Sequence, residues 1–119
     1  MNHQDLLHKW QTEFKKGFSK PLILQSLSEG KNYPYPLTKK IKELSNGMIS
    51  IAGSNIYPML TNLEKEELIA SQSVEITTKE GKTKKRNIYE ITEEGKEFLE
   101  HLKLSMQEFT EVIQKIIYP

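Results

Sequence analysis

Residues 55–68 read NIYPMLTNLEKEEL, and the fold prediction begins from this stretch. Its apolar residues recur at spacings of four and three, which predicts a helix with one buried face. These residues are Ile56, Leu60 and Leu63. Ser54 is expected to cap the helix, so that Pro58 falls in the first turn, where a missing N–H is tolerated. The outward face then carries Asn55, Thr61, Asn62 and Lys65.

Two further helices are predicted before this stretch. Ser19 is a candidate cap for the first, in which Pro21 lies in the first turn and Leu22, Ile23, Leu24 and Leu27 are buried. EGKNYPYP, residues 29–36, predicts a turn because two prolines and a glycine forbid a continuous helix. Pro36 can then start a helix that ends at Asn46 and Gly47, with Leu37, Ile41 and Leu44 on its inner face.

A β-hairpin is predicted after this stretch. VEIT, residues 74–77, and NIYEIT, residues 87–92, show strand-like alternation, and the basic segment 78–86 joins them as a solvated tip. Three helices followed by a hairpin give the order of a winged helix-turn-helix, a mainly helical α+β fold. In that design, the outer face of the third helix enters the major groove of DNA and the hairpin reaches neighbouring phosphates.

The first and last helices carry apolar stripes that extend beyond this unit. Leu6, Leu7, Trp10 and Phe14 mark a helix over residues 4–16 that Gly17 ends, and a longer stripe runs from Phe98 to Ile116. We expect a second copy of the chain to cover both stripes. The predicted interface residues are Leu6, Trp10, Phe14, Leu102, Met106, Phe109, Ile113 and Ile116.

Composition agrees with a single small domain. The 119 residues carry a net charge of +1, but residues 1–47 and residues 79–86 each carry +4, so the charge is segregated along the chain. Hydrophobic residues make up only 36%, which favours association with another chain. The absence of cysteine excludes disulfides and thiolate sites and favours the cytoplasm. The N-terminus lacks the continuous apolar region of a signal peptide, and no run of residues is apolar enough to span a membrane.

The segment GSNIYPMLTNLEKEELI resembles the PadR-type signature, in which Gly-Thr-Leu-Tyr-Pro opens a helix that ends near Glu-Gly-Leu-Ile. Tyr57-Pro58 is its most specific element. YPYPLTKKIKEL is similar to the preceding His-Gly-Tyr-Glu segment, with Tyr35 retained, and KKRNIYEITEEG resembles the wing-to-helix signature. The resemblance covers about residues 17–99. Ala52, Gly53 and Ser54 replace the usual Ser-Pro-Gly, which predicts a shifted start for the recognition helix.

The resemblance implies a dimeric bacterial transcriptional regulator, usually a repressor, whose C-terminal helix forms the dimer. It places Tyr35, Ser54, Asn55 and Tyr57 at or near DNA, and Lys84, Lys85 and Arg86 in the wing. Residues 1–14 have no firm counterpart. We therefore expect an N-terminal arm (1–16), a DNA-binding domain (17–92) and a dimerisation helix (93–119).

The prediction is a homodimer on a palindromic operator, with no cofactor or metal. Its DNA-contacting residues are Tyr35, Lys39, Ser54, Asn55, Tyr57, Thr61, Asn62, Lys65, Lys82, Lys84, Lys85 and Arg86.

Alternatives remain open for several of these features. The basic segment 79–86 can be a solvated loop, Tyr35 and Tyr57 can be structural, and Trp10 can either pack or flank a small-molecule effector at the dimer interface. A winged fold can also bind an acidic protein partner through its basic hairpin. No nucleophile, base and orienting group form a recognisable set, so an enzyme is not expected. The three histidines, His3, His8 and His101, lack metal-ligand spacing.

Overall fold

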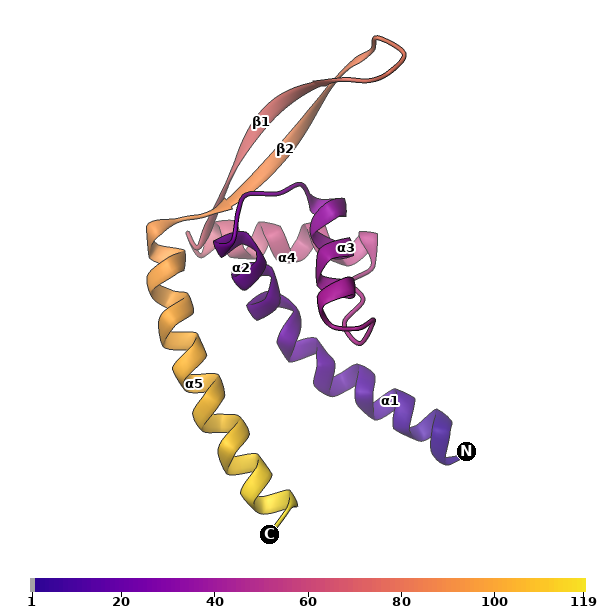
Figure 1. Ribbon diagram of the computed structural model, residues 1–119, viewed down its shortest axis with the longest axis vertical. Coiled ribbons are helices and arrows are strands. Elements are labelled where there is room, and N and C mark those ends of the chain that lie inside the picture. The colour runs from indigo at the N-terminus through magenta and orange to yellow at the C-terminus, as the bar shows by residue number, and fades with distance from the viewer. Residues whose placement is uncertain (1) are drawn as a thin grey trace.

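The computed structural model describes residues 2–119, and Figure 1 shows their arrangement as a winged helix with two projecting helices. Helix α1 (His3–Lys15) passes through a short 3₁₀ turn (Lys16–Phe18) into α2 (Ser19–Ser28). Helices α3 (Pro34–Leu44) and α4 (Gly53–Lys65) follow, then strands β1 (Ile69–Thr77) and β2 (Thr83–Ile91), and finally α5 (Glu93–Ile117). This order confirms the predicted fold class.

Helices α2, α3 and α4 enclose the core together with the base of the hairpin. Burying each large apolar side chain contributes about 1.5–3 kcal/mol, so this cluster supplies most of the domain's internal stability. The predicted inner face of α4 is confirmed. The most completely buried side chains are Ile23, Leu24, Leu27, Leu37, Ile41, Ile56, Leu60 and Leu63.

Strands β1 and β2 form the wing, an antiparallel hairpin that projects beyond the helices (Figure 1). Its base is held by the segment between α2 and α3, because Asn32 and Tyr89 exchange backbone hydrogen bonds of 3.0 and 2.8 Å. Burial raises the pKa of the Tyr89 phenol above its usual value. The base of the wing therefore packs into the core, whereas the part toward the tip is exposed.

Helices α3 and α4 both end in a left-handed residue that reverses the chain. After α3, Asn46 has a φ of 53° and the Gly47 N–H donates to the Lys42 carbonyl at 2.7 Å. After α4, Glu67 has a φ of 63° and the Leu68 N–H donates to the Leu63 carbonyl at 3.0 Å. These are Schellman endings. The first directs residues 47–52 into α4, and the second directs α4 into the wing.

Helix α5 is fastened to the end of α4 by a compact joint. The Thr92 side chain accepts from the Gly95 N–H at 2.9 Å and donates to the Glu67 carbonyl at 2.7 Å. A Cβ atom at Gly95 would overlap the Leu68 carbonyl oxygen and lie 2.7 Å from Ile91 Cγ1. Glycine at this position therefore permits the close approach of α5 to the backbone that follows α4.

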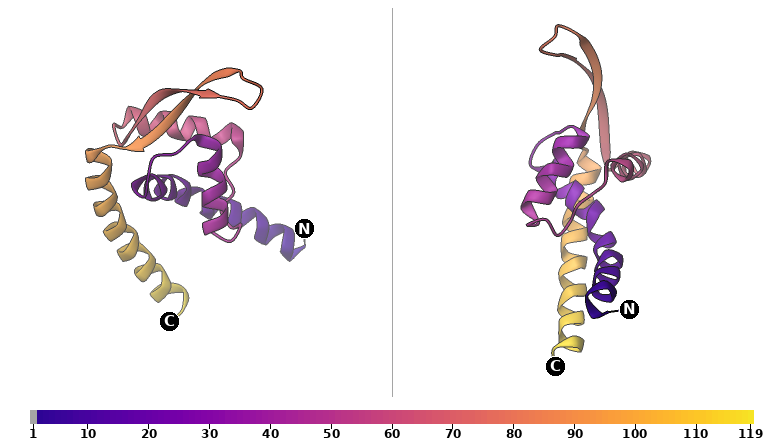
Figure 2. Two further views of the ribbon diagram at one scale, coloured as in Figure 1. Left: turned by 45° about the horizontal axis from the view of Figure 1, so that its top comes forward. Right: turned by 90° about the vertical axis from the view of Figure 1, so that its right-hand side faces the viewer.

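Helices α1 and α5 extend away from the core as two arms, on the opposite side from the wing tip (Figures 1 and 2). None of the residues His3–Lys15 is buried, and Trp10 is 66% exposed. In α5, Leu102 and Met106 are half-buried beside α2, whereas Phe109 is 67% and Ile116 72% exposed. Within the described residues, no helix has both the length and the apolar character needed to cross a membrane.

Two predictions about helix ends are wrong. Ser19 does not cap α2, because the backbone stays right-handed through the 3₁₀ turn and Ser19 lies inside a helical run that begins in α1. Helix α1 itself ends at Lys15, close to the predicted end at Lys16, and Gly17 lies in the 3₁₀ turn that follows. Ser54 does not cap α4, because the helix starts at Gly53 with Ala52 at the N-cap.

Three other local expectations change with these boundaries. The turn predicted over residues 29–36 is shorter, because α3 starts at Pro34 and both prolines lie in its first turn. Pro58 is the sixth residue of α4 and not part of the first turn, so the Ser54 carbonyl has no helical N–H donor. Leu44, the last residue of α3, is 66% exposed, so burial along this helix stops at Ile41.

Candidate nucleic-acid interface

The exposed side of α4 is divided into three rows of side chains by the helical period. The outermost row contains Ser54, Thr61 and Lys65, all exposed and on the side away from the buried stripe of Ile56, Leu60 and Leu63. Asn55 and Asn62 lie seven residues apart and form a second row, on the flank of the helix that carries Met59. The predicted polar residues of α4 are therefore all accessible, and they lie in two neighbouring rows on the outward side of the helix.

The third row, on the opposite flank, faces the wing. Tyr57, 58% exposed, and Glu64 lie seven residues apart on this flank. Glu64 Oε2 accepts a hydrogen bond of 3.0 Å from the Ser71 hydroxyl of β1. This bond fixes the start of the wing against α4, so Tyr57 lies on the flank of α4 that faces the wing.

Helix α3 adds a second accessible surface beside α4. Tyr35, in its first turn, is 77% exposed and lines a cavity of about 580 Å³ with Lys39 and Lys42. The cavity continues along residues 46–51, the segment that connects α3 to α4. Tyr35 and Lys39, two of the predicted DNA contacts, thus line one cavity, and Lys42 joins them at the next turn of the helix.

The basic residues of the wing are distributed differently from the prediction. The tip contains residues 78–82, whereas Lys84, Lys85 and Arg86 belong to β2. Lys84 and Arg86 are paired with Ile76 and Val74 on one face of the hairpin, and Lys85 is paired with Glu75 on the other. Only Lys84 and Arg86 therefore form a single basic face, because Lys85 has a carboxylate directly across the ladder.

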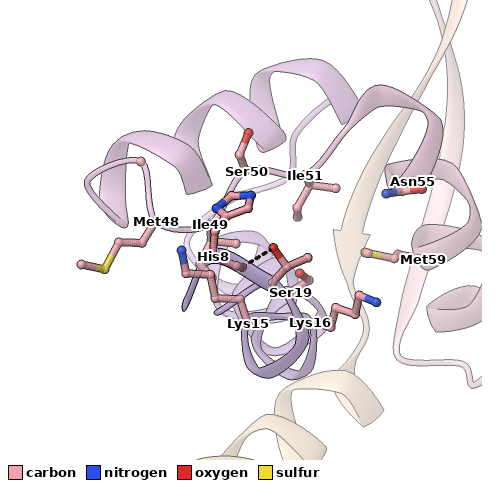
Figure 3. A pocket seen from close by; sticks show the side chains of 12 residues that line it. His8, Lys15, Lys16, Ser19, Met48, Ile49, Ser50, Ile51, Asn55 and Met59 are labelled. Atoms are coloured by element: carbon pink, nitrogen blue, oxygen red, sulfur yellow. Dashed lines mark hydrogen bonds between the residues drawn. The ribbon is translucent and has the colours of Figure 1, made fainter. Parts of the chain in front are cut away.

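A second cavity, of about 360 Å³, separates α1 from α4 and is called here the α1–α4 cavity (Figure 3). In Figure 3, Lys16 extends toward Met59 and Asn55, while His8 lies near Ile49 and Ser50. The sequence alone indicates no functional role for the α1 residues of this cavity. The full lining is His8, Thr12, Lys15, Lys16, Ser19, Gly47, Met48, Ile49, Ser50, Ile51, Asn55 and Met59.

One ion pair ties the helices of the interface together. Lys40 Nζ in α3 lies 2.8 Å from Glu29 Oε2 at the end of α2. The hydrogen bond from Lys40, with a further bond from Gln25, holds the pKa of the Glu29 carboxyl below its usual value. The pair is solvent-exposed, so its contribution is to orientation of α3 more than to stability. No group of three or more potential ligands among residues 2–119 is arranged to hold a metal ion.

A family model described as the transcriptional regulator PadR-like family matches residues 23–101. Among solved structures, a PadR family transcriptional regulator from Eggerthella lenta superposes with a TM-score of 0.81 at 25% identity, covering 98% of this chain and 96% of that chain. A transcriptional regulator from Clostridium thermocellum gives 0.77 at 28% identity, over 87% and 96% of the two chains. No curated protein matches the sequence.

A further similar structure contains nucleic acid. It is Bacillus subtilis PadR in complex with operator DNA, which matches with a TM-score of 0.60 at 30% identity. The alignment covers 70% of this chain and 45% of that chain.

Proposed function

Because the chain belongs to the PadR-like family of transcriptional regulators, we propose that it is a homodimeric repressor that binds an approximately palindromic operator. The observation that carries the proposal is the placement of an exposed polar helix, α4, beside a projecting wing with a basic face. Helix α4 fits the major groove, and Lys84 and Arg86 reach flanking phosphates. The operator DNA in the similar Bacillus subtilis complex supports this assignment.

The predicted DNA contacts take separate roles in this proposal. Base readout belongs to Asn55 and Asn62 on one flank of α4 and to Ser54, Thr61 and Lys65 on its outermost row. Tyr35, Lys39 and Tyr57 hold the adjoining backbone. In the wing, Lys82 at the tip and Lys84 and Arg86 on one face neutralise phosphates, and Lys85 contributes less because of Glu75.

The dimer is proposed from the two arms. Residues 93–119 pair with a second copy through Leu102, Met106, Phe109, Ile113 and Ile116, and the arm at residues 1–16 adds Leu6, Trp10 and Phe14. Met1 lies outside the described residues. Residues 17–92 form the DNA-binding unit between them. Exposed Trp10 also offers a ring on which a planar effector can stack at this interface.

The test separates base readout from phosphate contact. Genomic fragments are selected on the wild-type protein, and affinity for the recovered motif is compared with affinity for mixed-sequence DNA. We expect N55A/N62A to lower the ratio of the two affinities, since a well-made base contact discriminates by about 1–3 kcal/mol. K84A/R86A should weaken binding to both DNAs alike, since phosphate contacts carry no sequence information. Q107A/Q114A, on the polar side of α5, is the control.

Two results would count against the proposal. Equal loss on both DNAs for both variants would mean that the roles of α4 and the wing are wrongly assigned. Recovery of no enriched motif would favour the second candidate, a winged module that binds an acidic protein through the face formed by Lys84 and Arg86.

A further inference from the structure

The α1–α4 cavity brings basic side chains of the N-terminal arm next to the recognition helix. Lys15 lines it from the end of α1, Lys16 from the 3₁₀ turn that follows, and Asn55 from α4. Among the described residues that form its walls, none is acidic, and the remaining polar groups are hydroxyls and the His8 imidazole. The rest of the lining is apolar and comes from Met48, Ile49, Ile51 and Met59. A cavity whose polar groups are cationic and neutral donors, without carboxylates, is suited to an anion.

The position of these lysines follows from the amphipathic character of α1. His8, Thr12 and Lys15 recur at spacings of four and three and line the α1–α4 cavity. The opposite stripe of the same helix carries Leu6, Trp10 and Phe14, which lie on a separate surface. The helix therefore has an exposed apolar face and, opposite to it, a basic face toward α4.

Two ordinary explanations for adjacent lysines at this place do not apply. Cations near a helix C-terminus commonly compensate free carbonyl groups. Here Lys15 lies in the last turn of α1 and Lys16 is its C-cap, but the backbone stays right-handed through the 3₁₀ turn into α2, so the helix does not end in open solvent. Lysines on a surface helix also commonly pair with acids, but within residues 2–119 neither lysine forms an ion pair.

We propose that Lys15 and Lys16 bind a backbone phosphate of DNA, making α1 a third DNA-contacting element beside α4 and the wing. The inference rests on the proposed function, since it requires DNA along α4. A strand whose bases are read by Asn55 passes the mouth of the cavity that Asn55 shares with both lysines. Lysine binds phosphate as a mobile point charge, so the exposed Lys16 can follow the strand, whereas Lys15 is half-buried and has less freedom to move.

The two faces of α1 together determine where on the operator its phosphate contacts would lie. The helix that contacts the phosphate is the helix whose apolar face is expected to contact the second copy. Phosphate contacts from α1 therefore lie on the part of the protein nearest the partner, between the two recognition helices. This places them on the central part of the operator and the wing contacts on its outer parts.

The experiment measures the salt dependence of binding to a mixed-sequence duplex, which isolates phosphate contacts. We compare the wild-type protein with K15Q/K16Q and with K103Q/K115Q, a control that removes the same charge from α5. Each phosphate contact contributes about 0.9 to the slope of log K against log salt. K15Q/K16Q should reduce the slope by about 1–2. The control should keep the wild-type slope, and circular dichroism and thermal melting should show both variants folded.

The outcomes separate this inference from the proposed function. If the wild-type protein shows no salt-dependent binding to DNA, both are overturned. If it binds but K15Q/K16Q retains the wild-type slope, the inference alone is overturned. The DNA-free proteins are also melted in inorganic phosphate and in chloride at equal ionic strength. Stabilisation by phosphate that K15Q/K16Q abolishes, with the DNA slope unchanged, would assign the cavity to a free phosphorylated molecule and overturn the inference.

Discussion

Helices α4 and α1 have the same length and the same kind of apolar spacing, yet their surroundings differ. In α4, the apolar stripe is covered, and Ile56, Leu60 and Leu63 are at most 2% exposed. In α1, Trp10 and Phe14 are 66% and 60% exposed, and no residue from His3 to Lys15 is buried. An amphipathic pattern therefore specifies a face that must be covered, but it does not specify which chain covers it.

The outer half of α5, like α1, carries apolar side chains that the described chain leaves exposed. Phe109, Val112 and Ile116 are each more than half exposed, although Leu99 near the start of the helix is buried. Contiguous exposed apolar surface of this kind is characteristic of interaction sites. The core should thus be stable at any protein concentration, whereas the arms should gain stability as the concentration of a second copy rises.

The largest expected effect is on association through the arms. Replacing Phe109 and Ile113 by Glu would place two carboxylates in the proposed interface, at a cost of several kcal/mol each. We expect the dimer dissociation constant to rise by about a thousandfold or more, since each 1.4 kcal/mol is a factor of ten. Sedimentation velocity measures the change. Thermal melting should also lose its dependence on protein concentration.

The control for this variant adds the same charge elsewhere on α5. Gln107 and Gln114 lie on the side of the helix away from the apolar stripe, so Q107E/Q114E should remain dimeric. A dimer that survives F109E/I113E would show that the outer half of α5 is not the interface.

The next largest effect is a loss of stability in the core, and it should not depend on protein concentration. Leu60→Ala removes a side chain that is 0% exposed and leaves a cavity among α2, α3 and α4. We expect a loss of about 2–5 kcal/mol in the free energy of unfolding. Urea unfolding at two protein concentrations measures it. The neighbouring Thr61→Ala should change stability by less than about 0.5 kcal/mol, because Thr61 is exposed. Equal losses for both variants would contradict the assignment of the core.

The buried faces could be predicted from the sequence because apolar spacing records them directly. The helix ends could not be, because Ser19 and Ser54 carry the usual signal of an N-cap without acting as one. Ser19 follows a helix that simply continues. Gly53 begins α4 although its sequence neighbours suggested a later start, and this shift moves Pro58 into the second turn.

The sequence was enough to propose which residues belong to the site, but not how those residues are placed relative to one another. Alternation along the hairpin is visible in the sequence, yet the register that sets Lys85 opposite Glu75 depends on where the turn falls. The α1–α4 cavity is formed by two segments whose nearest lining residues, Ser19 and Gly47, are 28 residues apart, so no local pattern could have joined Lys16 to Asn55. The only local signal was the polar row His8, Thr12 and Lys15 opposite the apolar stripe of α1.

A smaller effect is expected where the α5 arm joins the core. Gly95→Ala would bring a Cβ atom against the Leu68 carbonyl oxygen, a backbone atom that cannot rotate away. We expect a loss of about 1–3 kcal/mol, the usual cost of overpacking. Urea unfolding measures it, with Gly17→Ala as the matched control, because a Cβ at Gly17 meets nothing within 4 Å. A neutral Gly95→Ala would mean that α5 is held less closely than its contacts indicate.

The smallest effect concerns the same joint and has the opposite sign. Glu67 adopts a left-handed conformation with a φ of 63°, which costs a residue with a Cβ roughly 1–2 kcal/mol. Glycine removes this strain but loses more backbone entropy on folding, by roughly 0.5–1 kcal/mol. Glu67→Gly should therefore stabilise the domain by about 0.5–1 kcal/mol in urea unfolding.

The appropriate control for Glu67 is its neighbour Glu66, the C-cap of α4, which has a φ of −81°. Glu66→Gly removes the same charge without relieving strain, so it should destabilise the domain slightly. The Glu67 carbonyl accepts the Thr92 hydroxyl at 2.7 Å, and this bond survives the substitution because it uses the backbone. If Glu67→Gly destabilises as much as Glu66→Gly, the joint derives stability from the Glu67 side chain, and its left-handed conformation is not the dominant cost.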